Sequence, residues 1–344
     1  FIPTWSLAAG NTGYGILERK PGIGLADLLA RMNLRLAENL KDFSGVFVID
    51  AERWIQSAGK EAFNTKLWYM GKIPFGNPVF KKAVTEIKSG LTGIMGGAKK
   101  LILVDLDDTI WGGIVGEEGW QKLKLGGHDP VGEAFSDFQR ALKSLTRRGV
   151  LLGIVSKNEE KVALEAIDKN PEMILNLEDF VGWRINWSDK ARNILELTEE
   201  LNLGLNSVVF IDDNPVERAR IRETLPEVLV PDWPQDKMLY KHCLMSLNCF
   251  NTPIISLEDG ERTKMYQTES HRKKLKEKLG SLEDWLKTLE TKVVIEEINE
   301  ANLQRSSQLF NKTNQMNLST RRLTETKLMS WAKEENHRMW TFRV

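Results

Sequence analysis

Residues that could do chemistry follow three short apolar runs of this 344-residue sequence. They are Asp105, Asp107, Asp108 and Thr109 after the first run, Ser156 and Asn158 after the second, and Asp212, Asp213 and Asn214 after the third. Lys190 stands at the start of a helical pattern between the second and third runs. In open α/β sheets the reactive groups lie at the carboxyl ends of the strands, so we expect these residues to meet at one sheet edge.

Many carboxylates at one sheet edge repel one another and take up protons unless a cation lies among them. Mg²⁺ is the expected cation, because it is a hard ion that prefers carboxylate oxygens. Ser156 and Lys190 add a hydroxyl and an ammonium around a second, anionic group. The set predicts a phosphoryl group held beside Mg²⁺, with one carboxylate as nucleophile and another as acid or base. Taken singly, each residue has a plain alternative as a turn or cap residue, so the prediction rests on the whole set in chain order.

The elements that must position these residues alternate between strands and helices from residue 100 onward. Short apolar runs separated by amphipathic stretches indicate βαβ units. They predict an α/β, Rossmann-like core, which is a parallel sheet with flanking helices on both faces. The expected strands are 101–105, 150–156, 207–212 and 227–231, and the expected helices are 131–148, 158–168, 189–202 and 215–223.

Shifts in composition divide the chain into four expected parts. A glycine-rich stretch at 90–100 separates a partial N-terminal α/β segment, residues 1–96, from the core at 97–235. A helical linker is expected at 236–290, and 291–344 has the pattern of the start of a second small α/β domain. We expect both outer segments to be truncated.

Composition and charge disfavour several classes of protein. Lys and Arg number 48 and Asp and Glu number 48, so the net charge is zero, which argues against a nucleic-acid partner or an anionic membrane surface. No apolar stretch approaches the ~20 residues that a membrane span needs. The two cysteines, Cys243 and Cys249, argue against a disulfide framework and favour a cytoplasmic location. The four histidines show no zinc-ligand spacing.

Four of the motifs resemble those of the haloacid dehalogenase (HAD) superfamily of phosphatases. They are DLDDT at 105–109, VSKN at 155–158, DK at 189–190 and IDDNP at 211–215. Longer stretches, such as LDDTIWGGIVGEEG at 106–119 and LFNKTNQMNLSTRR at 309–322, resemble the FkbH-like proteins of polyketide pathways. The resemblance covers residues 97–344. It implies a HAD core, with a truncated SGNH-like segment before it and a truncated acetyltransferase-like (GNAT-like) segment after it.

The resemblance implies a role for each catalytic residue. Asp105 matches the nucleophile that forms an aspartyl-phosphate, and Asp107 matches the general acid and base. Ser156 and Lys190 match the hydroxyl and the ammonium that hold the phosphate.

The resemblance also implies the Mg²⁺ ligands. They are Asp105, the backbone carbonyl of Asp107, and the acidic pair, of which Asp213 is preferred over Asp212.

The loop after the nucleophile is expected to lie near the substrate. Asp108 is interpreted as a turn residue. Trp111 and Gly112 are expected to wall the substrate pocket, with the alternative that Trp111 packs beneath a flexible turn. Further pocket residues are expected at Thr109, Asn158 and Asn214.

FkbH-like proteins are implied to take the three-carbon unit of D-1,3-bisphosphoglycerate, remove phosphate, and load a glyceryl group onto the phosphopantetheine arm of an acyl carrier protein. The thioester step calls for a thiol, and Cys249, where a helix is expected to end, is the candidate. A plain structural role for Cys249 and direct transfer to the carrier thiol are the alternatives. Cys243 is expected to be a core residue.

Two rival functions stay open. One is a plain HAD phosphatase of a small phosphorylated metabolite without acyl transfer, and the other is a docking module that binds the carrier protein without catalysis. The complete set of phosphatase residues disfavours the docking module. The basic run at 271–278 is expected to be a solvated helix face or a contact for an acidic carrier. The polar stretch 310–317 and Arg321–Arg322 are interpreted as carrier or substrate contacts, or as caps and packing.

Overall fold

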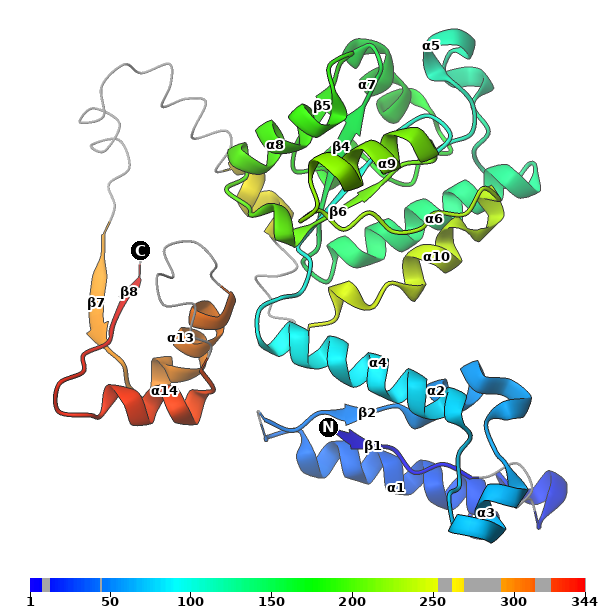
Figure 1. Ribbon diagram of the computed structural model, residues 1–344, viewed down its shortest axis with the longest axis vertical. Coiled ribbons are helices and arrows are strands. Elements are labelled where there is room, and N and C mark those ends of the chain that lie inside the picture. The colour runs from blue at the N-terminus through cyan, green and yellow to red at the C-terminus, as the bar shows by residue number, and fades with distance from the viewer. Residues whose placement is uncertain (8–12, 44, 253–261, 269–291, 313–322, 344) are drawn as a thin grey trace. The chain divides into compact units, whose positions relative to one another are not determined.

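The computed structural model describes residues 1–7, 13–43, 45–252, 262–268, 292–312 and 323–343 (Figure 1). Within these ranges the chain divides into two compact units, Phe1–Leu91 and Thr92–Val344. The basic run at 271–278, residues 313–317 of the polar stretch, and Arg321–Arg322 lie outside the described residues. Among the described helices, none is both long and apolar enough to cross a membrane.

The first unit is a small α/β assembly. Two short parallel strands, β1 (Ile2–Pro3) and β2 (Val48–Ile49), pair with each other. The helices are α1 (Leu25–Leu40), α2 (Ala51–Ala58), α3 (Thr65–Gly71) and α4 (Asn77–Ile94), the last of which runs past the unit's end. Its core is small and centres on Ala51, Trp54, Ala62 and Val79. The SGNH-like character of this segment stays a prediction.

The second unit is built on a four-stranded parallel sheet in the order β5-β4-β3-β6. Its strands are β3 (Leu101–Val104), β4 (Leu151–Ser156), β5 (Trp183–Ile185) and β6 (Val208–Ile211). The helices between and after them are α5 (Val115–Glu118), α6 (Pro130–Thr146), α7 (Glu160–Lys169), α8 (Lys190–Glu200), α9 (Pro215–Thr224) and α10 (Tyr240–Ser246). The prediction of an α/β core with a parallel sheet and flanking helices is therefore confirmed.

Alternation along the central strand explains why both faces of the sheet are covered. Ile102 and Val104 pack into one hydrophobic cluster, which also holds residues of α6, α7 and α10. Leu101 and Leu103 pack into the cluster that holds residues of α8 and α9 on the other face. Successive strand side chains point to opposite faces, and burial of each large apolar side chain contributes roughly 1.5–3 kcal/mol. The sheet is therefore buried on both faces, and the polar residues lie in the loops that follow its strands.

Side-chain caps determine where the helices after the strand ends begin. The Asp189 carboxylate accepts the N–H of Ala191 at the start of α8, and the Asn214 side chain accepts the N–H of Val216 at the start of α9. Such caps satisfy backbone donors that have no partner within the helix. Asn214, predicted as a pocket residue, is thus the cap of α9.

The core does not end at residue 235, where the sequence analysis placed its boundary. Tyr240 and Leu244 of α10, and Phe250 of the short 3₁₀ turn Asn248–Phe250, are buried in the same cluster as Phe138 of α6. The amphipathic pattern of this stretch is that of a helix in any setting, so the pattern alone did not distinguish a linker from a core helix. Beyond it, residues 262–268 are helical, and the rest of the expected linker lies outside the described residues.

The expected strand at 227–231 is reduced to one bridge. Only Leu229 pairs, with Val209 of β6. Pro226 and Pro231 flank this stretch and lack the N–H that a longer ladder needs.

The C-terminal segment contains an antiparallel pair of strands with two helices between them. These elements are β7 (Val294–Glu297), α13 (Glu300–Lys312), α14 (Glu325–Ala332) and β8 (Trp340–Arg343). Its relation to acetyltransferase-like domains stays a prediction.

Candidate active site

The carboxyl ends of three neighbouring strands bring the predicted catalytic residues together. Asp105 follows β3, and its N–H donates to the carbonyl of Ile211 at the end of β6 (2.9 Å). Ser156 ends β4, where it is buried, and Asp212 and Asp213 follow β6. Because neighbouring strands lie only about 4.8 Å apart, these side chains share one small region.

Lys190 is buried between two of the carboxylates. Its Nζ lies 2.6 Å from Asp212 Oδ2 and 2.9 Å from Asp105 Oδ1, and the residue is 3% exposed. Burial alone would lower the pKa of Lys190, but the negative charges of Asp105 and Asp212 outweigh it and raise that pKa. The ammonium therefore stays charged across the physiological range.

Asp212 has both carboxylate oxygens engaged within the protein. Oδ2 accepts from Lys190, and Oδ1 accepts the N–H of Asn214 (2.8 Å). Burial and the nearby Asp105 charge raise the pKa of Asp212 to about 6, against the opposing effect of Lys190. Asp212 is fully buried, so its main contact is Lys190 rather than solvent.

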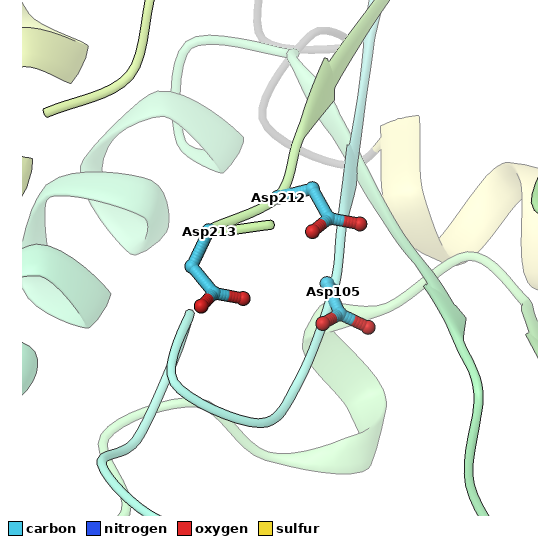
Figure 2. A group of neighbouring side chains, drawn as sticks. All are labelled: Asp105, Asp212 and Asp213. Carbon is cyan, nitrogen blue, oxygen red and sulfur yellow. The ribbon is translucent and has the colours of Figure 1, made fainter. Parts of the chain in front are cut away.

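Asp213 is the member of the acidic pair that is better placed for a cation. The side chains of Asp105, Asp212 and Asp213 lie together (Figure 2), and one carboxylate oxygen from each lies within 4.8 Å of the other two. Both oxygens of Asp212 have close partners (2.6 and 2.8 Å), whereas the contacts of Asp213 with Thr109 and Lys237 are longer (3.4 Å each). Asp213 is therefore the freer of the two to hold a metal ion together with Asp105. Burial raises the pKa of Asp213, against the opposing effect of the Lys237 charge. The all-oxygen donor set fits Mg²⁺.

Thr109 connects the loop after β3 to Asp213. Its side chain is fully buried, and its hydroxyl oxygen accepts the N–H of Asp213 (3.1 Å). Thr109 therefore links the loops after β3 and β6 from beneath, instead of facing a pocket.

Three donors hold the side chain of Asp107. Oδ1 accepts the indole N–H of Trp111 (2.9 Å) and the backbone N–H of Val115 (3.0 Å), and Oδ2 accepts the Asn158 amide (2.8 Å). The pKa of Asp107 is raised by burial, which outweighs the three hydrogen bonds that lower it. Asp107 is only partly buried, and the Asn158 side chain is turned toward it.

The expectation that Trp111 and Gly112 wall the substrate pocket does not hold. Trp111 is 0% exposed and packs in the core cluster, since its ring fills the space under the loop. Gly112 is also buried; its backbone pairs with Lys124 in both directions, and a side chain there would lie 2.9 Å from the ring of Phe135. Asp108 takes a left-handed conformation (φ 53°) and turns the chain, as interpreted from the sequence.

Three residues that the sequence analysis missed surround the site. Lys237 Nζ donates to the carbonyl of Asp108 (2.8 Å) and lies 3.4 Å from Asp213 Oδ2. The Tyr240 hydroxyl donates to the same carbonyl (3.3 Å). Arg218 donates to the carbonyls of both Asp212 and Asp213 (2.7 and 2.6 Å). Arg218 follows IDDNP within a longer stretch that resembles the family, but no role was assigned to it, and only the fold brings residues 237 and 240 back to the loop after β3.

Cys249 lies at the opposite end of the sheet from the carboxylates. Its carbonyl accepts the N–H of Lys99, which precedes β3, whereas Asp105 follows β3. Strands rise roughly 3.3 Å per residue, so the six steps from Lys99 to Asp105 separate these points by roughly 20 Å. Burial raises the pKa of the Cys249 thiol to about 11, and Cys243 has a raised pKa for the same reason. The described structure therefore does not join Cys249 to the acidic site.

Comparison with solved structures finds a likeness to a phosphatase domain. The N-terminal part of the protein BF1531 from Bacteroides fragilis, which contains a phosphatase domain complexed with Mg, aligns with a TM-score of 0.68 and 32% sequence identity. The alignment covers 72% of this chain and 66% of that one, so this chain spans just under two thirds of its length. No family model matches this chain, and no curated protein matches it. The likeness supports the prediction of a HAD-like core.

Proposed function

We propose that the chain is a Mg²⁺-dependent phosphatase that acts through an aspartyl-phosphate on Asp105. The observation that carries the proposal is the burial of Lys190 against Asp105 and Asp212, with Asp213 facing Asp105 across the sheet edge. An ammonium fixed in this position supplies positive charge next to the carboxylate that attacks a phosphoryl group. The likeness to a phosphatase domain complexed with Mg supports the same assignment.

Each residue of the proposed site has a separate role in the hydrolysis of a phosphate ester. An Asp105 oxygen attacks phosphorus, the bond to the ester oxygen breaks, and that oxygen takes the proton of Asp107. Water then attacks the aspartyl-phosphate and gives a proton back to Asp107, which frees Asp105 and inorganic phosphate. Ser156 and Lys190 hold the non-reacting phosphoryl oxygens. Asp105, Asp213 and the carbonyl of Asp107 would hold Mg²⁺, which would supply positive charge to neutralise the phosphoryl oxygens.

The test is release of phosphate from p-nitrophenyl phosphate in the presence and absence of Mg²⁺. Asp105→Asn keeps the shape of the side chain and removes the nucleophile, so we expect the release to fall to background. Asp137→Asn, on α6 and paired with Arg140 and Lys241, is the matched control and should keep the wild-type rate. Normal turnover by Asp105→Asn would overturn the nucleophile assignment.

A finer proposal concerns the substrate and rests on the resemblance to FkbH-like proteins. D-1,3-bisphosphoglycerate is proposed as substrate, with the glyceryl unit loaded onto an acyl carrier protein. The position of Cys249, at the far end of the sheet, favours direct attack by the carrier thiol over a Cys249 thioester at this site. Intact-mass analysis of a carrier protein incubated with the chain and the bisphosphate tests this. A glyceryl adduct is expected, whereas phosphate release without an adduct would favour the plain phosphatase.

A further inference from the structure

We propose that Trp111 is a positioning residue for the general acid. Its indole N–H and the Asn158 amide hold the Asp107 carboxyl in the orientation in which it protonates the leaving oxygen. The inference rests on the proposed function, because it gives Trp111 a task only if Asp107 transfers a proton to the departing group.

The contacts define the plane of the Asp107 carboxyl. Trp111 Nε1 lies 2.9 Å from Oδ1, and Asn158 Nδ2 lies 2.8 Å from Oδ2, so a donor is fixed on each oxygen. The two donors come from different elements, since Trp111 follows β3 and Asn158 follows β4. A carboxyl held at both oxygens cannot rotate about its terminal bond without breaking one of these hydrogen bonds.

Burial makes the Trp111 contact rigid. The ring is 0% exposed and is packed in the same cluster as Ile110, Phe135 and Tyr240. An indole N–H is a donor only, and a buried one needs an acceptor to offset the loss of water. The acceptor here is a partly exposed acid at the site, so the core is connected directly to the group that must move a proton.

Asn158 connects the same acid to the phosphate-holding strand. It lies two residues after Ser156, and its side chain is buried. The end of β4 therefore places the hydroxyl for the phosphoryl group and a donor for the acid in one short stretch. A precise carboxyl position relative to the phosphoryl group follows, which is what proton transfer in a transition state requires.

The test is Trp111→Phe with two aryl esters, phenyl phosphate and p-nitrophenyl phosphate. Phenolate is the poorer leaving group and depends on protonation, whereas p-nitrophenolate departs without it. We expect kcat/KM for phenyl phosphate to fall about 10-fold or more, which is part of the roughly 10²–10⁴-fold that a general acid contributes, and kcat/KM for p-nitrophenyl phosphate to fall less than about 3-fold. A merely structural role for Trp111 would lower both values equally.

Trp183→Phe is the matched control. Its indole donates to Glu160 (2.9 Å) at an exposed position, so the variant removes an indole–carboxylate hydrogen bond that does not involve Asp107. Both esters should keep their wild-type values of kcat/KM in this variant.

An isosteric replacement separates the hydrogen bond from packing. Benzothienylalanine introduced at position 111 by codon suppression keeps the bicyclic shape but lacks the N–H. We expect it to reproduce the selective loss on phenyl phosphate. Wild-type kcat/KM on both esters with this residue, or equal losses on both with Trp111→Phe, would overturn the inference. If the wild-type chain hydrolysed neither ester, the proposed function itself would fail.

Discussion

Replacement of Lys190 by Met is the sharpest test of the electrostatics of the site. In the native protein the Lys190 ammonium lies between Asp105 and Asp212, at 2.9 and 2.6 Å. The methionine keeps most of the volume of the side chain but leaves two buried carboxylates without their shared partner. Removal of one member of a buried ion pair costs about 3–5 kcal/mol, because the remaining charge is uncompensated. We expect a loss of this size in the free energy of unfolding at pH 8, in metal-free protein.

The loss should shrink as the pH falls. Asp212 has a folded pKa of about 6, above its ordinary value of 3.8, so the folded state binds more protons than the unfolded state between these values. Native stability therefore falls as the pH rises toward 6. Lys190 opposes this rise in pKa, so its removal raises the pKa of Asp212 further. At pH 5 Asp212 of the variant is protonated, and the deficit should be less than about half of its value at pH 8.

Hydrogen exchange measured by mass spectrometry on peptides from β3 and β6 gives the assay, because it reports opening of this sheet alone. Lys143→Met is the matched control, since Lys143 forms one partly exposed ion pair with Asp179 (2.9 Å). The free energy of unfolding of this variant should be lower than that of the wild type by about 1 kcal/mol or less, with little dependence on pH. An equal deficit at pH 5 and pH 8 for Lys190→Met would refute the reasoning.

Three further predictions concern the metal and the cysteine. Chelation of divalent ions should stop phosphate release, and added Mg²⁺ should restore it; an unchanged rate would argue against the metal. Asp213→Asn should weaken Mg²⁺ binding, measured by calorimetry, at least about 10-fold, as loss of a charged ligand implies, and more than Asp137→Asn does. Cys249→Ser should leave phosphate release within about 2-fold of wild type, because Cys249 lies roughly 20 Å from Asp105 along β3; a large loss would place the thiol in the site.

The sequence predicted the position of reactive side chains well where these side chains come directly after a strand. Asp105, Ser156 and Asp212 end apolar runs, and parallel pairing alone brings such residues to one edge. Lys190 was found from its place at a helix start, and the structure gives that start a cap at Asp189. The alternation of apolar runs and amphipathic stretches was therefore enough to predict both the sheet and most of the acidic site.

The sequence was less informative where a role depends on tertiary packing. The sequence around Trp111 is compatible with a ring that lines a pocket and with one that packs in the core. The burial of the ring in the structure shows that it packs in the core. Lys237 and Tyr240 reach Asp108 because the short 3₁₀ turn Lys237–Leu239 and α10 both pack on α6, which is far away in the chain. The boundary at 235 was misplaced for the same reason. Local patterns do not encode which helix covers which face.

The most direct test of the central claim is a search for the aspartyl-phosphate itself. The Asp107→Asn variant, which lacks the base for the second step, is mixed with p-nitrophenyl phosphate and Mg²⁺, quenched in acid and mapped by peptide mass spectrometry. The account predicts a phosphate adduct on the peptide that contains Asp105, and no adduct when Asp105 is also replaced by Asn. Phosphate release by the wild-type chain with no adduct on that peptide, or an adduct on another residue, would contradict it.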